Sequence, residues 1–194
     1  MRRQPTFYNG VPNIGSLLLL VMIIIPSVST AAGNATAFSE TLTNNIRMVQ
    51  HLALNPLLAK AVKQQNSQDF SLEKAKLLNS RWQEFDNNGE LKLALSEGID
   101  AEMIRQFIER NSAFEYAILT DQNGSTVAAY PEPDQYWYGS EDSWLHTYND
   151  GKGQVFISPI ELDEKTKKYV ALVAAPVLDR AQTVGVLTVG ISLK

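Results

Sequence analysis

The sequence predicts an α+β protein in which several helices precede a mostly antiparallel sheet of five strands. Up to about Asn111, apolar residues recur every three or four positions, which is the period of an amphipathic helix. After Asn111 the period changes to two, and short polar turns separate runs rich in β-branched and aromatic residues. Short turns join antiparallel neighbours, and helices segregated from such a sheet are typical of the α+β class.

Residues 1–32 have the order of a secretory signal peptide. Two arginines precede an apolar run over residues 14–25, and small residues follow up to Ala32. The uninterrupted apolar core, residues 17–25, is shorter than the roughly 20 residues that span a bilayer, so we expect cleavage within the small residues that end at Ala32. If the segment is retained, it would anchor the protein in the inner membrane. In both cases we expect residues 33–194 to form one domain in the bacterial periplasm.

Composition narrows the possible functions. The chain has 17 Lys and Arg against 21 Asp and Glu, and the leader carries two of the arginines and none of the acids, so 15 against 21 leaves a formal charge of −6. An acidic domain without a basic cluster is a poor ligand for nucleic acids or anionic lipids. The chain contains no cysteine, so its stability must come from a packed core rather than from disulfides. A small ligand or a protein partner is the remaining expectation.

The helical part, residues 33–111, contains four predicted helices. Asn55, Ser71 and Asp100 are the expected N-caps of the last three, and Gly89 is the expected end of the third. The predicted helices run from about Ala37 to Leu54, from Pro56 through Val62, from Ser71 to Gly89, and from Asp100 through Ile108. Their apolar stripes are typical of packing against a sheet. The alternative for the first helix is a dimer interface between two copies of the chain.

The sheet part, residues 112–194, contains five predicted strands and one inserted helix. Asn123-Gly124 between the first two strands is a strong hairpin signal, and Pro131 ends the second strand. Ser140 is the expected N-cap of a short helix that Gly151 terminates. The predicted strands are Phe114–Thr120, Ser125–Tyr130, Gln154–Ile160, Tyr169–Leu178 and Val184–Ser192. The turns before the last two strands begin at Asp163 and Asp179.

An aromatic cluster between the second and third strands is the candidate binding feature. Tyr136, Trp137 and Tyr138 are consecutive, so they cannot all face the interior of an extended segment, and Trp144 and Tyr148 follow on the short helix. These rings could wall a pocket. The alternative is that they cap the core, with Asp163 on a solvated turn.

Three segments resemble the Cache superfamily, also called PDC-type sensor domains. They are residues 111–124 (NSAFEYAILTDQNG), residues 136–144 (YWYGSEDSW), and residues 175–190 with APVLD and VGVLTVG. The motif Leu54-Asn-Pro-Leu-Leu58 after the long first helix extends the resemblance over essentially the whole mature chain. Cache domains are the extracytoplasmic ligand modules of bacterial chemoreceptors, histidine kinases and cyclic-dinucleotide enzymes. The resemblance implies a single domain with a PAS-like sheet, a small-molecule ligand and a separate membrane signalling partner. Because the sequence ends at Lys194, directly after the last strand, we expect a stand-alone domain.

The resemblance also implies a set of ligand-binding residues. Members with two lobes that bind amino acids carry a Tyr, an Arg five residues later, a Trp-Tyr pair, a further Tyr and a later Asp. Gln135 stands where the Arg would bind the ligand carboxylate, so we expect a cationic amine ahead of an amino acid, with Asp163 and Asp134 as anions. An organic acid stays open if Lys167, Lys168 or Arg180 reaches the pocket. The expected ligand-binding residues are Tyr130, Gln135, Trp137, Tyr138, Trp144, Tyr148, Phe156 and Asp163.

Enzymatic function is not expected. The two histidines, His51 and His146, are far apart in sequence, and neither lies near a nucleophile motif. The sequence has no Gly-Xaa-Ser-Xaa-Gly, His-Glu-Xaa-Xaa-His or phosphate-binding glycine loop, so we expect neither a metal nor a cofactor. The sequence therefore predicts a ligand-sensing domain. The alternative is an interaction or dimerisation module of the same fold that binds no ligand.

Overall fold

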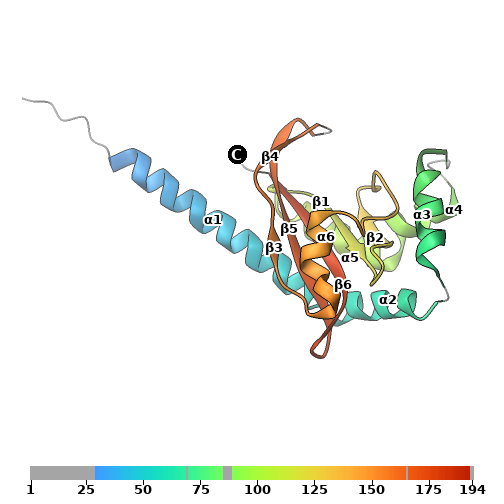
Figure 1. Cartoon of the computed structure of the whole chain (residues 1–194). Coiled ribbons are helices and arrows are strands. Elements are labelled where there is room, and N and C mark those ends of the chain that lie inside the picture. Colours follow the sequence, from blue (N-terminus) through green and yellow to red (C-terminus); the bar gives the residue numbers. More distant parts are fainter. Residues whose placement is uncertain (1–28, 69, 85–88, 165, 193–194) are drawn as a thin grey trace, which may run out of the picture.

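The computed structural model describes residues 29–68, 70–84, 89–164 and 166–192 and has the expected α+β architecture (Figure 1). The helices are α1 (Ser29–Ala53), α2 (Pro56–Asn66), α3 (Leu72–Ser80), α4 (Glu90–Glu97), α5 (Ile99–Glu109) and α6 (Asp142–Tyr148), with short 3₁₀ turns at Trp82–Glu84 and Asn149–Gly151. The strands are β1 (Phe114–Thr120), β2 (Thr126–Tyr130), β3 (Phe156–Ile157), β4 (Glu161–Asp163), β5 (Lys168–Asp179) and β6 (Gln182–Ser192).

The strands form one antiparallel sheet in the order β2-β1-β6-β5-β3, and β4 also pairs with β5. The sheet has six strands instead of the expected five, because the expected strand Gln154–Ile160 is reduced to β3 and an unpredicted strand, β4, follows it. Pro159 has no N–H to donate, and the Ser158 hydroxyl accepts a hydrogen bond from the Leu172 amide at 2.9 Å. A break therefore separates β3 from β4. Asp163 is the last residue of β4 and, as expected, begins the turn to β5, because its carbonyl accepts a hydrogen bond from the Lys167 amide at 2.8 Å.

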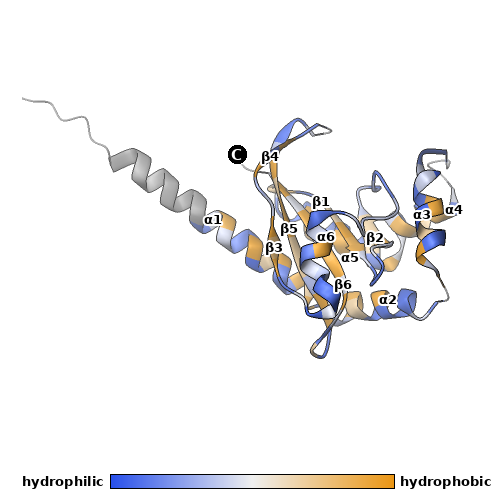
Figure 2. Cartoon of the chain, viewed as in Figure 1, coloured by the Kyte–Doolittle hydropathy of each residue, from blue (hydrophilic) through white to orange (hydrophobic). Residues whose placement is uncertain are grey.

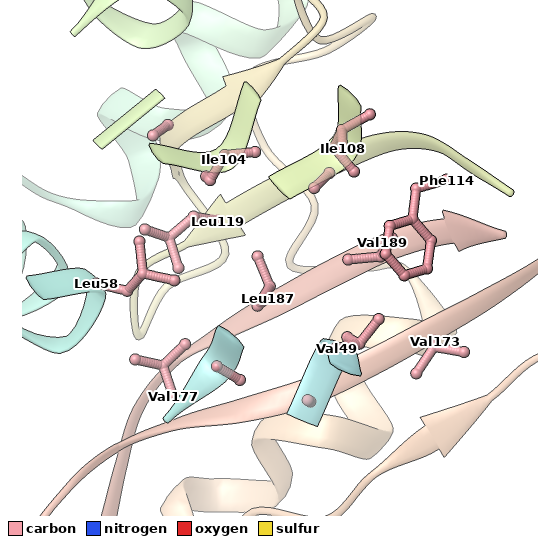
Figure 3. Close-up of a cluster of buried hydrophobic side chains, with 14 of the residues drawn as sticks. Val49, Leu58, Ile104, Ile108, Phe114, Leu119, Val173, Val177, Leu187 and Val189 are labelled. Atoms are coloured by element: carbon pink, nitrogen blue, oxygen red, sulfur yellow. The ribbon is translucent and has the colours of Figure 1, made fainter. Parts of the chain in front are cut away.

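The main hydrophobic core lies between one face of the sheet and three helices. Val49 of α1, Leu58 of α2 and Ile104 of α5 meet alternate residues of the central strands, including Leu187 and Val189, and all five side chains are fully buried. Figure 3 shows these side chains pointing toward one another between the ribbons. Figure 2 shows the hydropathy of each residue, and the central strands β5 and β6, which contact this core, are predominantly hydrophobic. The expectation that the helical stripes pack against a sheet is thus confirmed for α1, α2 and α5.

A second, smaller core lies beside β2. Buried Ala75, Trp82 and Leu95 come from α3, the following 3₁₀ turn and α4, and Tyr136 from the loop after β2 completes the cluster. We call residues 70–84 and 89–97 the α3–α4 lobe. Tyr136 packs at a ring-centroid distance of 5.6 Å from Trp82, so the loop after β2 is a structural part of this lobe.

Two of the predicted N-caps are confirmed. The Asn55 side chain accepts a hydrogen bond from the Leu57 amide at 2.9 Å, and the Ser71 hydroxyl accepts one from the Lys74 amide at 3.3 Å. These bonds satisfy amides that the first turn of a helix leaves without an intrahelical partner.

Two helix predictions in this part are wrong. The third helix ends at Ser80 and does not reach Gly89; residues 85–88 lie outside the described residues, and α4, which was not predicted, follows at Glu90. Asp100 lies inside the first turn of α5, and Gly98 occupies the cap position. The short spacing between Gly89 and Gly98 hides α4 in the sequence, because a helix of eight residues shows barely two apolar turns.

The expected cap and stop of the inserted helix also differ from the structure. Glu141, not Ser140, is the N-cap of α6, and its side chain makes no capping bond. Asn149 ends the helix in the left-handed conformation, with φ of 44°, two residues before Gly151. Asparagine tolerates this conformation better than most residues, so it can replace glycine at a helix end.

The segment expected to be a signal peptide, residues 1–32, lies outside the described residues except for its last four, which begin α1. Among the described helices, none combines the length and the apolar composition that crossing a bilayer requires.

Candidate ligand pocket

A pocket of about 290 Å³ lies on the face of the sheet opposite the main core. Its floor is made by Tyr116 and Ile118 of β1, Leu172 of β5 and Thr188 of β6. These residues alternate with buried core residues on the same strands, so their side chains point to the other face. The volume lies at the lower end of the range for small-molecule sites, which is roughly 300–1,000 Å³.

The other walls come mainly from two connections. Residues 131–141, which link β2 to α6 and which we call the roof segment, contribute most of them. Asp163 and Thr166, at the end of β4 and in the turn after it, contribute a second part, and Glu115 of β1 and Ser143 of α6 complete the lining. The complete lining is Glu115, Tyr116, Ile118, Pro131, Glu132, Pro133, Asp134, Gln135, Tyr138, Glu141, Ser143, Asp163, Thr166, Leu172 and Thr188.

The β1–β2 hairpin fixes the path of the roof segment. Asp121 Oδ1 accepts hydrogen bonds from the amides of Asn123 and Ser125, both at 2.8 Å, and closes the turn. Gly124 follows with φ of 82°, a conformation that side chains rarely adopt. Its carbonyl accepts a bond from the Tyr138 amide at 2.8 Å, so the roof segment returns along the hairpin and reaches the sheet face.

The charged side chains of the pocket lining are all carboxylates. Five of the lining side chains are acidic, namely Glu115, Glu132, Asp134, Glu141 and Asp163, and none of the lining residues that the structure describes is basic. Lysines outside the lining pair with two of the acids: Lys168 Nζ lies 2.8 Å from Glu115 and Lys92 Nζ lies 2.9 Å from Glu132.

Neutral donors bind two further acids. The Gln135 side-chain amide donates to Glu141 Oε1 at 3.1 Å, and the Thr166 amide donates to Asp163 Oδ1 at 2.8 Å. Despite the acids, no group of three or more His, Cys, Asp or Glu among the described residues is arranged to hold a metal ion.

Two phenols lie among these acids. Burial raises the pKa of Tyr116 to about 12, and the charges of Asp163 and Asp134 contribute further to this increase. Burial also raises the pKa of Tyr138, more strongly than the backbone bond at Gln135 lowers it. Both phenols are therefore neutral at physiological pH. The negative charges of Asp163 and Asp134 both act on the Tyr116 hydroxyl, so their electric fields overlap there.

Three of the eight expected ligand-binding residues, Gln135, Tyr138 and Asp163, line the pocket together. The structure places two others in contacts elsewhere. Tyr130 donates its hydroxyl to Glu109 Oε1 at 3.0 Å, and Trp137 donates Nε1 to the Asn123 carbonyl at 2.6 Å.

The last three expected residues form ring pairs along α6. Trp144 stacks on Tyr148 with a centroid distance of 4.9 Å and donates Nε1 to the Asp121 carbonyl at 3.3 Å. Phe156 stacks on His146 at 5.4 Å. The indoles of Trp137 and Trp144 thus bind carbonyls of the hairpin turn, and neither belongs to the pocket lining.

Sequence reasoning did not select Tyr116, Glu115 or Glu132, which line the pocket. A signal for Tyr116 existed, because it alternates with Ala117 on a strand whose other face is buried. No signal placed Glu132 beside it, because the two residues are 16 positions apart and meet only through the return of the roof segment.

Comparison with known proteins gives matches only among solved structures; no protein family and no curated protein matches the sequence. The ligand-binding domain of the Pseudomonas aeruginosa PAO1 amino acid chemoreceptor PctB, in complex with L-Arg, is 18% identical, with a TM-score of 0.43 over 80% of this chain and 51% of that chain. The corresponding domain of PctC from the same organism, in complex with GABA, is 15% identical, with a TM-score of 0.40 over 78% and 61%.

The sensor domain of the V. cholerae histidine kinase DctB is 16% identical, with a TM-score of 0.38 over 78% of this chain and 58% of that chain. These neighbours are extracytoplasmic sensor domains of the Cache, or PDC, type. This chain spans about half to three-fifths of the length of these neighbours. With TM-scores below 0.5, these neighbours assign no ligand to this chain.

Proposed function

We propose that this chain is a Cache-type ligand-sensing domain that binds a small cationic amine. This proposal depends on the charge of the side chains that line the pocket. Five carboxylates and no described basic residue line a cavity of about 290 Å³, and lysines outside the lining pair with two of these acids, Glu115 and Glu132. A cavity of this charge attracts a cation and repels an anion of similar size.

The side chains supply what an ammonium group needs. Asp134 and Asp163 offer counter-charges, and the neutral phenols of Tyr116 and Tyr138 offer oxygen acceptors and ring faces. The apolar floor, Ile118 and Leu172, suits a short hydrocarbon chain attached to that group.

A carboxylate-bearing ligand fits less well. Gln135 is the pocket residue at the place where amino-acid-binding relatives would carry arginine, and its amide already donates to Glu141. A neutral amide cannot replace the paired N–H groups and the charge of a guanidinium. The amine is thus favoured over the amino acid and the organic acid.

We further infer that the domain works outside the cytoplasm and passes ligand occupancy to a membrane signalling protein. The arginines and the apolar run of residues 1–32 support export, and the Cache resemblance supports a signalling partner. Signalling of this kind does not require that the ligand react. It requires only that the occupied and the empty domain differ in free energy.

The test is thermal unfolding and calorimetric titration of the purified mature chain with butylamine, 4-aminobutanoate and butanoate. We expect butylamine to raise the unfolding temperature and butanoate to leave it unchanged, with 4-aminobutanoate between them. A larger shift with butanoate than with butylamine would contradict the amine assignment. No shift with any of the three would favour the alternative of an interaction module that binds no ligand.

A further inference from the structure

A nearly buried lysine stands directly behind the acidic wall of the pocket. Lys92 of α4 is 4% exposed and does not belong to the pocket lining, yet its Nζ lies 2.9 Å from Oε1 of Glu132, which does. The same ammonium lies 5.1 Å from the centroid of the Trp82 ring. A lysine is costly to bury, and here it is held between a carboxylate and an indole face.

The rest of the α3–α4 lobe holds the neighbouring backbone. Trp82 Nε1 donates to the Pro133 carbonyl and Gln83 Nε2 donates to the Asp134 carbonyl, both at 2.9 Å. Asn79 Oδ1 accepts from the amides of the next two aromatic residues, Tyr136 at 2.9 Å and Trp137 at 3.0 Å. From 132 to 137, every residue except Gln135 is therefore bonded to the lobe.

This anchoring limits how the pocket can respond to a change of charge. Because its backbone is held, the wall cannot simply move away when Glu132 loses its counter-ion. The carboxylate at 132 is 34% exposed and faces the pocket, so its uncompensated charge would act on whatever the pocket contains.

We propose that Lys92 is a positioning and specificity-determining residue of the pocket, which neutralises Glu132 from behind the wall and thereby sets how strongly the pocket selects for cations. This inference rests on the proposed amine-binding function. In this proposal the α3–α4 lobe sets the charge of the pocket through Lys92, although the helices of the lobe do not line the pocket.

The experiment is a double-mutant cycle on the full mature chain, with Lys92→Met, Glu132→Gln and the double variant, and butylamine as the probe. We expect K92M to tighten butylamine binding and E132Q to weaken it, each by about three- to tenfold, which is the effect of one unit charge a few ångströms away in a partly hydrated site. The double variant should return to within about twofold of the wild type, because it removes one charge of each sign.

Two controls separate charge from packing. Butan-1-ol, a neutral probe of similar shape, should show no difference among the four proteins; equal shifts for both probes would overturn the inference. Lys63→Met removes the lysine of the Lys63–Asp179 ion pair, and neither partner lines the pocket, so this variant should bind butylamine like the wild type. If K92M unfolds, the butylamine affinities of E132Q and the double variant still test the effect of the Lys92 charge, because these two proteins differ only at residue 92.

A second measurement needs no ligand. In hydrogen exchange of the free protein, residues 132–137 should exchange in K92M as slowly as in the wild type, because Asn79, Trp82 and Gln83 still hold this backbone. If the wild type binds no butylamine, the proposed function fails, and this exchange still tests the positioning role. If butylamine binds with equal affinity to all four proteins of the cycle, or exchange across residues 132–137 is faster in K92M, the inference that Lys92 acts through its charge on a fixed wall is wrong while the amine function stands.

Discussion

Asp163 lies at the end of β4, where the chain enters the turn to β5. Its Oδ1 accepts the Thr166 amide at 2.8 Å, and this bond holds the carboxylate at the pocket wall. The next residue, Glu164, is 78% exposed and pairs with Lys167 on the outside of the turn. Two adjacent acids thus have different environments, and only the first can act on a bound ligand.

Replacement of Asp163 by asparagine should weaken the binding of butylamine about tenfold, or about 1.4 kcal/mol, because it removes one anion and keeps the shape and the turn-closing acceptor. Calorimetric titration measures the effect. The matched control is Glu164→Gln, which changes the charge of the neighbouring residue and should leave the affinity within about twofold of the wild type. Equal losses in both variants would show that only the net charge of the molecule matters.

At the scale of elements, the roof segment depends on a close approach to the β1–β2 hairpin. A Cβ atom on Gly124 would lie 2.4 Å from backbone atoms of Gly139, and the φ of 82° at Gly124 is already unfavourable for a side chain. Gly151 has a similar φ of 80°, but the nearest atom to its Cβ position is 4.0 Å away. The two glycines share a conformation and differ in their surroundings.

Gly124→Ala should therefore lower the free energy of unfolding by at least about 3 kcal/mol, and Gly151→Ala by only about 1 kcal/mol, the conformational cost alone. Urea unfolding of both variants measures the difference. If the two variants lose equal stability, the contact between the hairpin and the roof segment contributes nothing beyond the backbone conformation.

At the scale of the whole molecule, buried tyrosines link stability to alkaline pH. Burial raises the pKa of both Tyr116 and Tyr136 to about 12, whereas an unfolded tyrosine titrates near 10. Below pH 10 both states keep their phenolic protons, so the contribution to stability is complete. Between pH 10 and about 12 the unfolded chain loses protons first, which favours unfolding.

We expect the free energy of unfolding to fall from pH 10 toward pH 12 by about 1.4 kcal/mol per pH unit for each of these two tyrosines. Urea unfolding at several pH values measures the slope. Tyr116→Phe should make it shallower, because phenylalanine has no proton to lose. A wild-type slope that stays flat above pH 10 would contradict the raised pKa values.

Association through α1 also concerns the whole molecule and remains a prediction. Met48 on this helix is 39% exposed, and His51, one turn away on the same helix, is exposed as well. We expect sedimentation equilibrium to show a dimer at micromolar concentration and Met48→Lys to weaken it, because a charge would be buried at the contact. A monomer mass at every concentration would exclude the interface.

Local sequence patterns determined most of the fold. The change of period at Asn111, the Asn123-Gly124 turn and the caps at Asn55 and Ser71 each depend on a few neighbouring residues, and the structure contains the expected hairpin, caps and α+β sheet. Where the local signal was weak, as for α4 between two glycines, sequence reasoning failed. The α+β fold class could therefore be predicted from the sequence alone.

Only the tertiary structure decided what lines the pocket. Trp137 and Trp144 carry the most conspicuous side chains of the sequence, yet their indole N–H groups bind carbonyls of the hairpin turn. Tyr116 and Glu132 gave no local sign that they would meet. The physical reason is that an aromatic ring can be buried equally well against a turn or in the wall of a cavity. Contacts between residues distant in sequence decide between the two, and no local sequence pattern records these contacts.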